Sequence, residues 1–408
     1  MVIATNKIAT VMVLGLFLDN MKRYLIIGLI VILGIGLFVL GYFLRKDKTP
    51  EPVNNGGQNP PSVSTSTPVV TPGKNSKLKL ESLGFSVKGF FADKDGGVIF
   101  VQPSGHINSL KDGKNTLISE TQILNITQAS FSYDGKKVLM GFGGRGNPQF
   151  SVYDIEKKSW QPLVAGVTAA EWNPNDSRIV YALKKEGYTS LSVLDFGVSK
   201  PSAKEITRLH VEDLVVGWMG KDEVAFWNKG SSKVDSSAWK INTTSKKLTS
   251  LFSNRTSLDL KVDDKGGNIL ATSDRNGAFT LSIFGKQGEI LKELAVRTPV
   301  DKCDFDIEQN LIKAASTKTK DKIAETTWLY CGAPKNFDVI TGKLLLEDYA
   351  KKQVFSLDNF FKFSVPAGSF SSIYEGPEDL DASQVRVIGN KFYFVNRYDE
   401  KLYSIALE

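Results

Sequence analysis

A motif that returns every 41–46 residues constrains the fold of this chain more than any other feature. Each copy has an apolar or aromatic anchor, a polar turn with Asp, Gly or Asn, and then an apolar strand. Four short strands within 40–45 residues are typical of one blade of a β-propeller. The anchors are Phe131, Trp172, Trp218, Val262 and Phe305, with weaker copies at 88–102 and 384–398. We therefore predict an all-β, seven-bladed β-propeller over residues 77–408; the weak end copies leave six or eight blades as alternatives.

The two ends of the repeat region complement each other. The last unit has strand patterns at 384–389, 391–396 and 401–407 and then the chain stops, one strand short of four. A spare alternating segment, KLKLES, stands at 77–82, before the first full unit. We expect this segment to pair with the last strand, because such pairing removes two exposed sheet edges.

The repeat units resemble those of a known class of propeller. ASFSYDGKKVLMGF (129–142), followed by FSVYDI (150–155), is similar to the WD40-like repeats of TolB-type propellers. The resemblance covers about residues 80–408 and implies a fold rather than an activity. With an apolar segment at 24–44 and a linker rich in Pro, Ser and Thr before the repeats, the chain resembles membrane-anchored bacterial envelope proteins.

The N-terminal part predicts a membrane anchor. Residues 24–44 are 21 residues without a charge, enough for one transmembrane helix across about 30 Å of hydrocarbon. A cleaved signal peptide is the rival interpretation, but the apolar run is long for one. Residues 1–23 form an N-terminal extension, and Met21, followed by Lys-Arg, has the pattern of the true start. Residues 45–76 are rich in Pro, Ser and Thr and predict an extended linker.

The charge distribution excludes a nucleic-acid partner. The net charge is +7, but +3 lies in residues 1–51 and +2 in 52–77, which leaves only +2 for the repeat region. Nucleic-acid binding requires a basic patch on the folded part. The basic residues that flank 24–44 are nearly balanced and do not fix its orientation. We expect the large domain outside the plasma membrane because of the linker composition and the cysteines.

Cys303 and Cys331 are the only cysteines. Each falls on a predicted strand, so we predict a cross-strand disulfide that closes a loop of about 29 residues and stabilises the fold by roughly 2–4 kcal/mol. Two buried free thiols are the alternative. Neither His106 nor His210 has metal-type spacing to a cysteine, so no metal site is predicted.

Motifs for catalysis are missing from the sequence. Gly141, Gly143 and Gly146 have G-x-G-x-x-G spacing, but a strand rather than a helix follows them, which favours a loop. No G-x-S-x-G nucleophile elbow occurs. We therefore predict no catalytic residue and no cofactor, and a protein that is not an enzyme.

Long loops at the centre of a propeller are the expected binding elements. The longest is the segment 335–358, and GGRGNPQ (143–149) lies on the same face. We predict a protein- or glycan-binding or scaffold module of the cell envelope, with Arg145, Asp348 and Tyr349 as contact residues. The alternative is a hydrolase or lyase that acts on polysaccharide through carboxylates in the central funnel.

Overall fold

The computed structural model describes residues 78–407 except 145–146, 276–277, 295, 313–321 and 336–345. The chain divides into two compact units, Met1–Thr67 and Pro68–Glu408, and every described residue belongs to the second. The predicted extension, membrane helix and linker lie outside the described residues. Among the residues that are described, no helix has the length and apolar character needed to cross a membrane.

The described residues form antiparallel sheets of consecutive strands, as the repeat predicts. The first contains β2 (Gly89–Ala92), β3 (Val98–Val101), β4 (Ile107–Lys111) and β5 (Lys114–Ser119). The second contains β6 (Ile126–Phe131), β7 (Lys137–Gly144), β8 (Asn147–Asp154) and β9 (Ser159–Pro162). The third contains β10 (Val167–Trp172), β11 (Arg178–Lys185), β12 (Tyr188–Asp195) and β13 (Ala203–Leu209).

A seven-stranded sheet follows. It contains β14 (Leu214–Trp218), β15 (Glu223–Asn228), β16 (Ser236–Asn242), β17 (Leu248–Val262), β18 (Asn268–Arg275), β19 (Ala278–Gly285) and β20 (Ile290–Leu294). The first half of β17 pairs with β16, and its second half pairs with β18. Between the halves, Asn254 and Ser257 both have a φ of 54°, which lets the strand leave one partner and join the next.

Two further sheets complete the ring. The 3-10 helix η1 (Val300–Lys302) leads into β21 (Cys303–Ile312), β22 (Lys322–Pro334), β23 (Asp358–Ser364) and β24 (Phe370–Tyr374), and the short helix α2 (Leu346–Ala350) lies between β22 and β23. The last sheet contains β25 (Ala382–Ile388), β26 (Lys391–Asn396), β27 (Lys401–Ala406) and, from the start of the domain, β1 (Leu80–Ser86).

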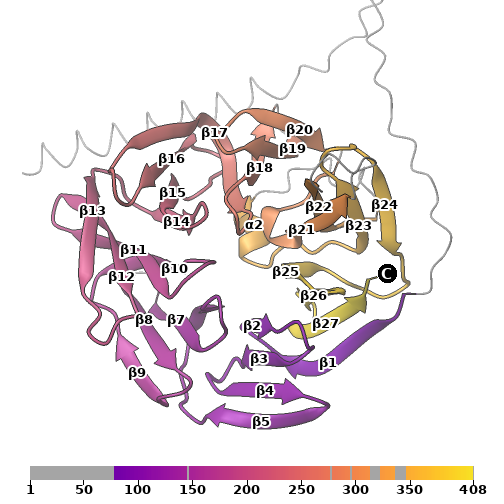
Figure 1. The fold of residues 1–408 in the computed structure, drawn as a ribbon, viewed down its shortest axis with the longest axis horizontal. Coiled ribbons are helices and arrows are strands. Elements are labelled where there is room, and N and C mark those ends of the chain that lie inside the picture. Colours follow the sequence, from indigo (N-terminus) through magenta and orange to yellow (C-terminus); the bar gives the residue numbers. More distant parts are fainter. Residues whose placement is uncertain are drawn as a thin grey trace, which may run out of the picture. The chain divides into compact units, whose positions relative to one another are not determined.

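The sheets stand radially around a common centre, and their first strands lie nearest to it (Figure 1). Because neighbouring strands are antiparallel, the connections between sheets and the turns between second and third strands share one face. We call it the insertion face, after the segment 335–357 between β22 and β23. The structure describes Lys335 and residues 346–357 of this segment, and these described residues are called the insertion. Turns between first and second, or third and fourth, strands lie on the opposite face.

Apolar side chains from adjacent sheets pack against each other and form the core. Val180 and Leu191 of the third sheet pack with Trp218 and Phe226 of the next one, and all four are nearly inaccessible to solvent. The indole N–H of Trp218 also donates to the backbone carbonyl of Glu171 at 3.2 Å. The repeat anchor Trp218 is therefore one of the residues that join one sheet to its neighbour.

The predicted closure of the ring is confirmed. β1 pairs antiparallel with β27, with Leu80 opposite Ile405 and Ser82 opposite Tyr403. The strand starts and ends later than the predicted 77–82, because the apolar residues Leu83 and Phe85 also pack on the first sheet. β1 is the fourth strand of the last sheet, which would otherwise have only three.

Removing β1 should open the ring. We expect deletion of residues 78–86 to lower the free energy of unfolding by about 3–6 kcal/mol, because the four apolar side chains of Leu78, Leu80, Leu83 and Phe85 lose their packing. The deletion should also promote aggregation through the exposed edge of β27. Chemical denaturation and size-exclusion chromatography measure both effects. Deleting an equally long piece of the linker, residues 48–56, should change neither; equal behaviour of the two deletions would contradict the closure.

Candidate functional site

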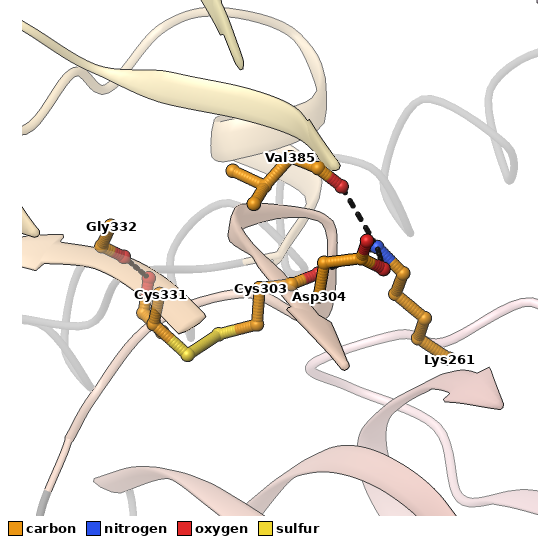
Figure 2. The surroundings of a disulfide bond; sticks show 7 residues. Lys261, Cys303, Asp304, Cys331, Gly332 and Val385 are labelled. Atoms are coloured by element: carbon orange, nitrogen blue, oxygen red, sulfur yellow. Dashed lines mark hydrogen bonds and ion pairs between the residues drawn. A yellow bond between two sulfur atoms is a disulfide. The ribbon is translucent and has the colours of Figure 1, made fainter. Parts of the chain in front are cut away.

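Charged side chains from the innermost strands meet at the centre of the ring. The ammonium of Lys261 on β17 lies 2.8 Å from the carboxylate of Asp304 on β21. It also donates to the carbonyl oxygens of Cys303 and Val385, at 2.6 and 3.1 Å. Figure 2 shows these groups converging from three strands. The guanidinium of Arg386 on β25 lies 3.7 Å from the same carboxylate, and 51% of its side chain remains exposed.

Two carboxyl groups of the innermost strands titrate near neutrality. Burial raises the pKa of Glu171 on β10 to about 7, although the charge of Arg386 opposes the rise. The carboxylate of Glu171 also accepts a hydrogen bond from Gln128 at 3.3 Å. Burial and then the nearby Asp301 carboxylate raise the pKa of Asp259 on β17 to about 7. Carboxyl groups with such pKa values can exchange protons at physiological pH.

A buried ion network lies on the insertion face, between η1 and the starts of β23 and β25. The side chain of Lys302 is 1% exposed, and its ammonium donates to Asp358 at 2.8 Å and to Asp381 at 2.5 Å. The guanidinium of Arg397 donates to the other oxygen of Asp381 at 2.7 Å. Ser356 accepts from Lys302 and donates to Asp358, so an insertion residue is part of the network.

The insertion is held across several blades. The hydroxyl of Tyr349 on α2 donates to the carboxylate of Asp301 at 3.1 Å, and the Tyr349 carbonyl accepts from Arg397 at 2.6 Å. The carboxylate of Glu347 accepts from Ser231 and from the backbone of Ser232, both in the β15–β16 turn. α2 accordingly lies toward the centre of the ring in Figure 1. The contacts join the insertion to loops of separate sheets.

The structure describes two of the three predicted contact residues, Asp348 and Tyr349. Arg145 lies outside the described residues. Asp348 is partly exposed on α2, and next to it Tyr349 is only 8% exposed and packs under Arg397. Their role in contacting a ligand stays a prediction. Sequence reasoning did not identify Lys302, Asp358, Asp381 or Arg397, which hold this region together.

The disulfide is present between Cys303 and Cys331. These residues stand directly opposite each other on β21 and β22, and both are buried (Figure 2). Asp304, the partner of Lys261, follows Cys303 directly. The cross-link therefore braces the strand from which Asp304, one of the central charges, projects.

Metal-binding geometry is not found in the described part of the chain. It contains no group of three or more His, Cys, Asp or Glu residues placed to hold a metal ion. The ring of His210 instead contacts the carbonyl oxygen of Gly187 at 2.9 Å.

A cleft of about 520 Å³ lies away from these charges, at the seam where the ring closes. It is on the opposite face, and its walls come from β1, β26 and the turns of the first sheet, including Glu81, Asp112 and Lys391. No member of the central cluster or of the ion network contributes to it.

The fold defines the class of protein: the described residues form a β-propeller. No protein-family model matches the sequence, and no curated protein matches it. Solved structures of other proteins do resemble it.

The oligogalacturonate lyase of Vibrio parahaemolyticus aligns with 82% of this chain and 95% of its own, at 10% identity and a TM-score of 0.53. An oligogalacturonate lyase in complex with manganese aligns over 81% and 93%, at 11% identity and a TM-score of 0.53. TolB from Acinetobacter baumannii aligns over 53% of this chain at 16% identity and a TM-score of 0.37; the match spans 54%, about half, of TolB. The two lyase matches, at 10% and 11% identity, support the propeller fold alone. TolB and WD40-type propellers are also among the structural neighbours.

The Glu171 carboxyl should make the protein less stable as the pH rises. Its pKa is about 7 in the fold, against an ordinary 4.5, so between these values the unfolded chain releases the proton and the folded chain keeps it. This contribution to stability is full below about pH 4.5 and is lost as the pH approaches 7. Glu171→Gln cannot ionise. We therefore expect its free energy of unfolding, relative to that of the wild type, to rise by about 1–3 kcal/mol between about pH 4.5 and pH 8, as measured by urea denaturation.

The matched control is Glu120→Gln, at an exposed position. Its stability should follow that of the wild type at both pH values. If the two variants behave alike, Glu171 is not held in a site that disfavours its charge.

Proposed function

We propose that this protein is a binding module of the cell envelope, a seven-bladed propeller that presents its insertion face to a protein or glycan partner. Seven blades result when the two halves of β17 are assigned to neighbouring blades. The observation that carries the proposal is the insertion itself, which hydrogen bonds of Glu347 and Tyr349 fix to three loops of the ring.

Buried ion pairs supply little net stability, since desolvation offsets most of their attraction. Their effect here is geometric. Lys302 and Arg397 form ion pairs with Asp358 and Asp381 when the loops adopt the arrangement seen here, so the pairs favour that arrangement. A loop that is already ordered loses less conformational entropy when it binds. The insertion face is thus a rigid composite surface made from several blades, as suits recognition.

The proposed tether is compatible with this orientation. β1 starts at the opposite face, so the described chain begins there and not at the insertion face. Residues 24–44 are the proposed single-pass anchor in the plasma membrane. The Cys303–Cys331 disulfide supports an extracytoplasmic location, where such bonds persist.

A second candidate function is hydrolysis or elimination on a polysaccharide. It is favoured by Glu171 and Asp259, whose pKa values of about 7 suit general acid and base catalysis. Both come from strands that line the centre of the ring. The oligogalacturonate lyases among the structural neighbours suggest polygalacturonate as the first substrate to test.

Site-specific photocrosslinking in native membranes tests the binding proposal. A photoreactive amino acid at Lys351, exposed on the insertion, should crosslink to a discrete partner that mass spectrometry identifies. The same group at Lys200, exposed in the β12–β13 turn of the opposite face, is the control and should give no such product. Products from position 200 alone would contradict the assignment of the face.

The enzymatic candidate makes a separate prediction. The full-length protein should degrade polygalacturonate with a rate that depends on pH around 7, and Glu171→Gln or Asp259→Asn should lower that rate by about 10²–10⁴-fold. Release of reducing ends and absorbance of unsaturated products measure it. Absence of product across the pH range would exclude this substrate.

A further inference from the structure

Two aromatic rings form an exposed platform on the insertion face. Phe355 of the insertion and Tyr398 of the β26–β27 turn stack with 5.0 Å between ring centroids and 23° between planes. They are 40% and 45% exposed, and Leu357, two residues after Phe355 in the chain, is 44% exposed. Contiguous exposed apolar surface of this kind marks interaction sites more often than isolated apolar residues do.

The platform is rigid because it rests on the buried ion network. The guanidinium of Arg397 lies 5.1 Å from the ring of Phe355 and 3.8 Å from the ring of Tyr349 beneath it. Arg397 is itself fixed by Asp381. The hydroxyl of Tyr398 donates to the carbonyl oxygen of Ser356 at 3.3 Å, which ties the two segments together. Rings held in this way lose little freedom when a ligand arrives.

The charge beside the platform is negative. The β24–β25 connection contains Glu375, Glu378 and Asp379, all exposed, and no ion pair of theirs occurs among the described residues. The ammonium of Lys335 donates to the carbonyl of Gly376 at 2.6 Å and brings one positive charge to this loop. Burial, then the carboxylates of Asp381, Asp379 and Asp358, raise the pKa of Tyr398, with Lys302 opposing, so a negative field reaches the ring.

We propose that the platform formed by Phe355 and Tyr398 binds a lysine or arginine side chain of an extended basic segment in a partner protein. The cation lies on the ring of Tyr398, where cation–π attraction is available, and Glu378 and Asp379 supply the counter-charge. This inference rests on the proposed binding function of the insertion face and specifies the partner chemistry. A neutral sugar gains no charge attraction from the carboxylates, and an acidic glycan is repelled by them.

Fluorescence anisotropy with the full-length protein in detergent tests the inference. The probes are labelled (Lys-Gly)₄ and (Arg-Gly)₄ peptides, with (Glu-Gly)₄ and a neutral oligosaccharide, chitotetraose, as comparisons. We expect saturable binding of the two basic peptides that weakens as salt rises, and none of the acidic peptide. Failure of both basic peptides to bind at low salt, or tighter binding of chitotetraose, would overturn the inference.

Substitutions then locate the site. Tyr398→Ala should weaken peptide binding about 5–30-fold, whereas Tyr398→Phe, which keeps the ring, should bind almost as wild type. Glu378→Gln with Asp379→Asn should weaken binding and flatten its salt dependence. The control is Tyr133→Ala, an equally exposed tyrosine in a turn of the opposite face, which should leave binding unchanged.

The outcomes separate this inference from the proposed function. Crosslinks from position 351 together with peptide binding that is indifferent to Tyr398→Ala would leave the binding module standing and remove the platform as its site. Thermal unfolding of each variant checks that the exposed substitutions leave the fold intact, and a Tyr398→Ala protein that is folded yet binds as wild type refutes the inference.

Discussion

The pairing of β1 with β27 is the constraint on which the rest of the structure depends. The last sheet has its full set of four strands only because the missing strand comes from the other end of the domain. Closure fixes the distance of each sheet from the centre. The innermost strands can then hold Glu171, Lys261, Asp304 and Arg386 close to one another, although these residues are far apart in the chain.

The ion network and the apolar core contribute differently to the structure. Apolar contacts between sheets are non-directional and tolerate small shifts, whereas the bonds of Lys302 to Asp358 and Asp381 fix directions as well as distances. These bonds lie where the longest segment between strands returns to the ring. The insertion is therefore part of the scaffold. The aromatic platform is rigid because it is built on this scaffold.

Much of the fold is predictable from the sequence, whereas the site is not. Strand periodicity and the 41–46-residue spacing suffice for the sheets, the closure and the Cys303–Cys331 pair, because these depend on neighbours along the chain or on a simple count. The continuity of β17 was not foreseen, since it depends on the backbone at Asn254 and Ser257. Lys302, Asp358 and Asp381 read as ordinary surface charges beside strand starts, and only the closed ring reveals that they meet.

The place of β1 also has a mechanical consequence. A force applied to the chain at the start of β1 pulls this strand along its own length, away from the insertion face at the strand's other end. β1 and β27 are antiparallel neighbours, so such a pull shears their ladder and loads its hydrogen bonds together instead of peeling them apart singly. The seam that closes the ring is thereby placed in the geometry in which a strand pair resists force best.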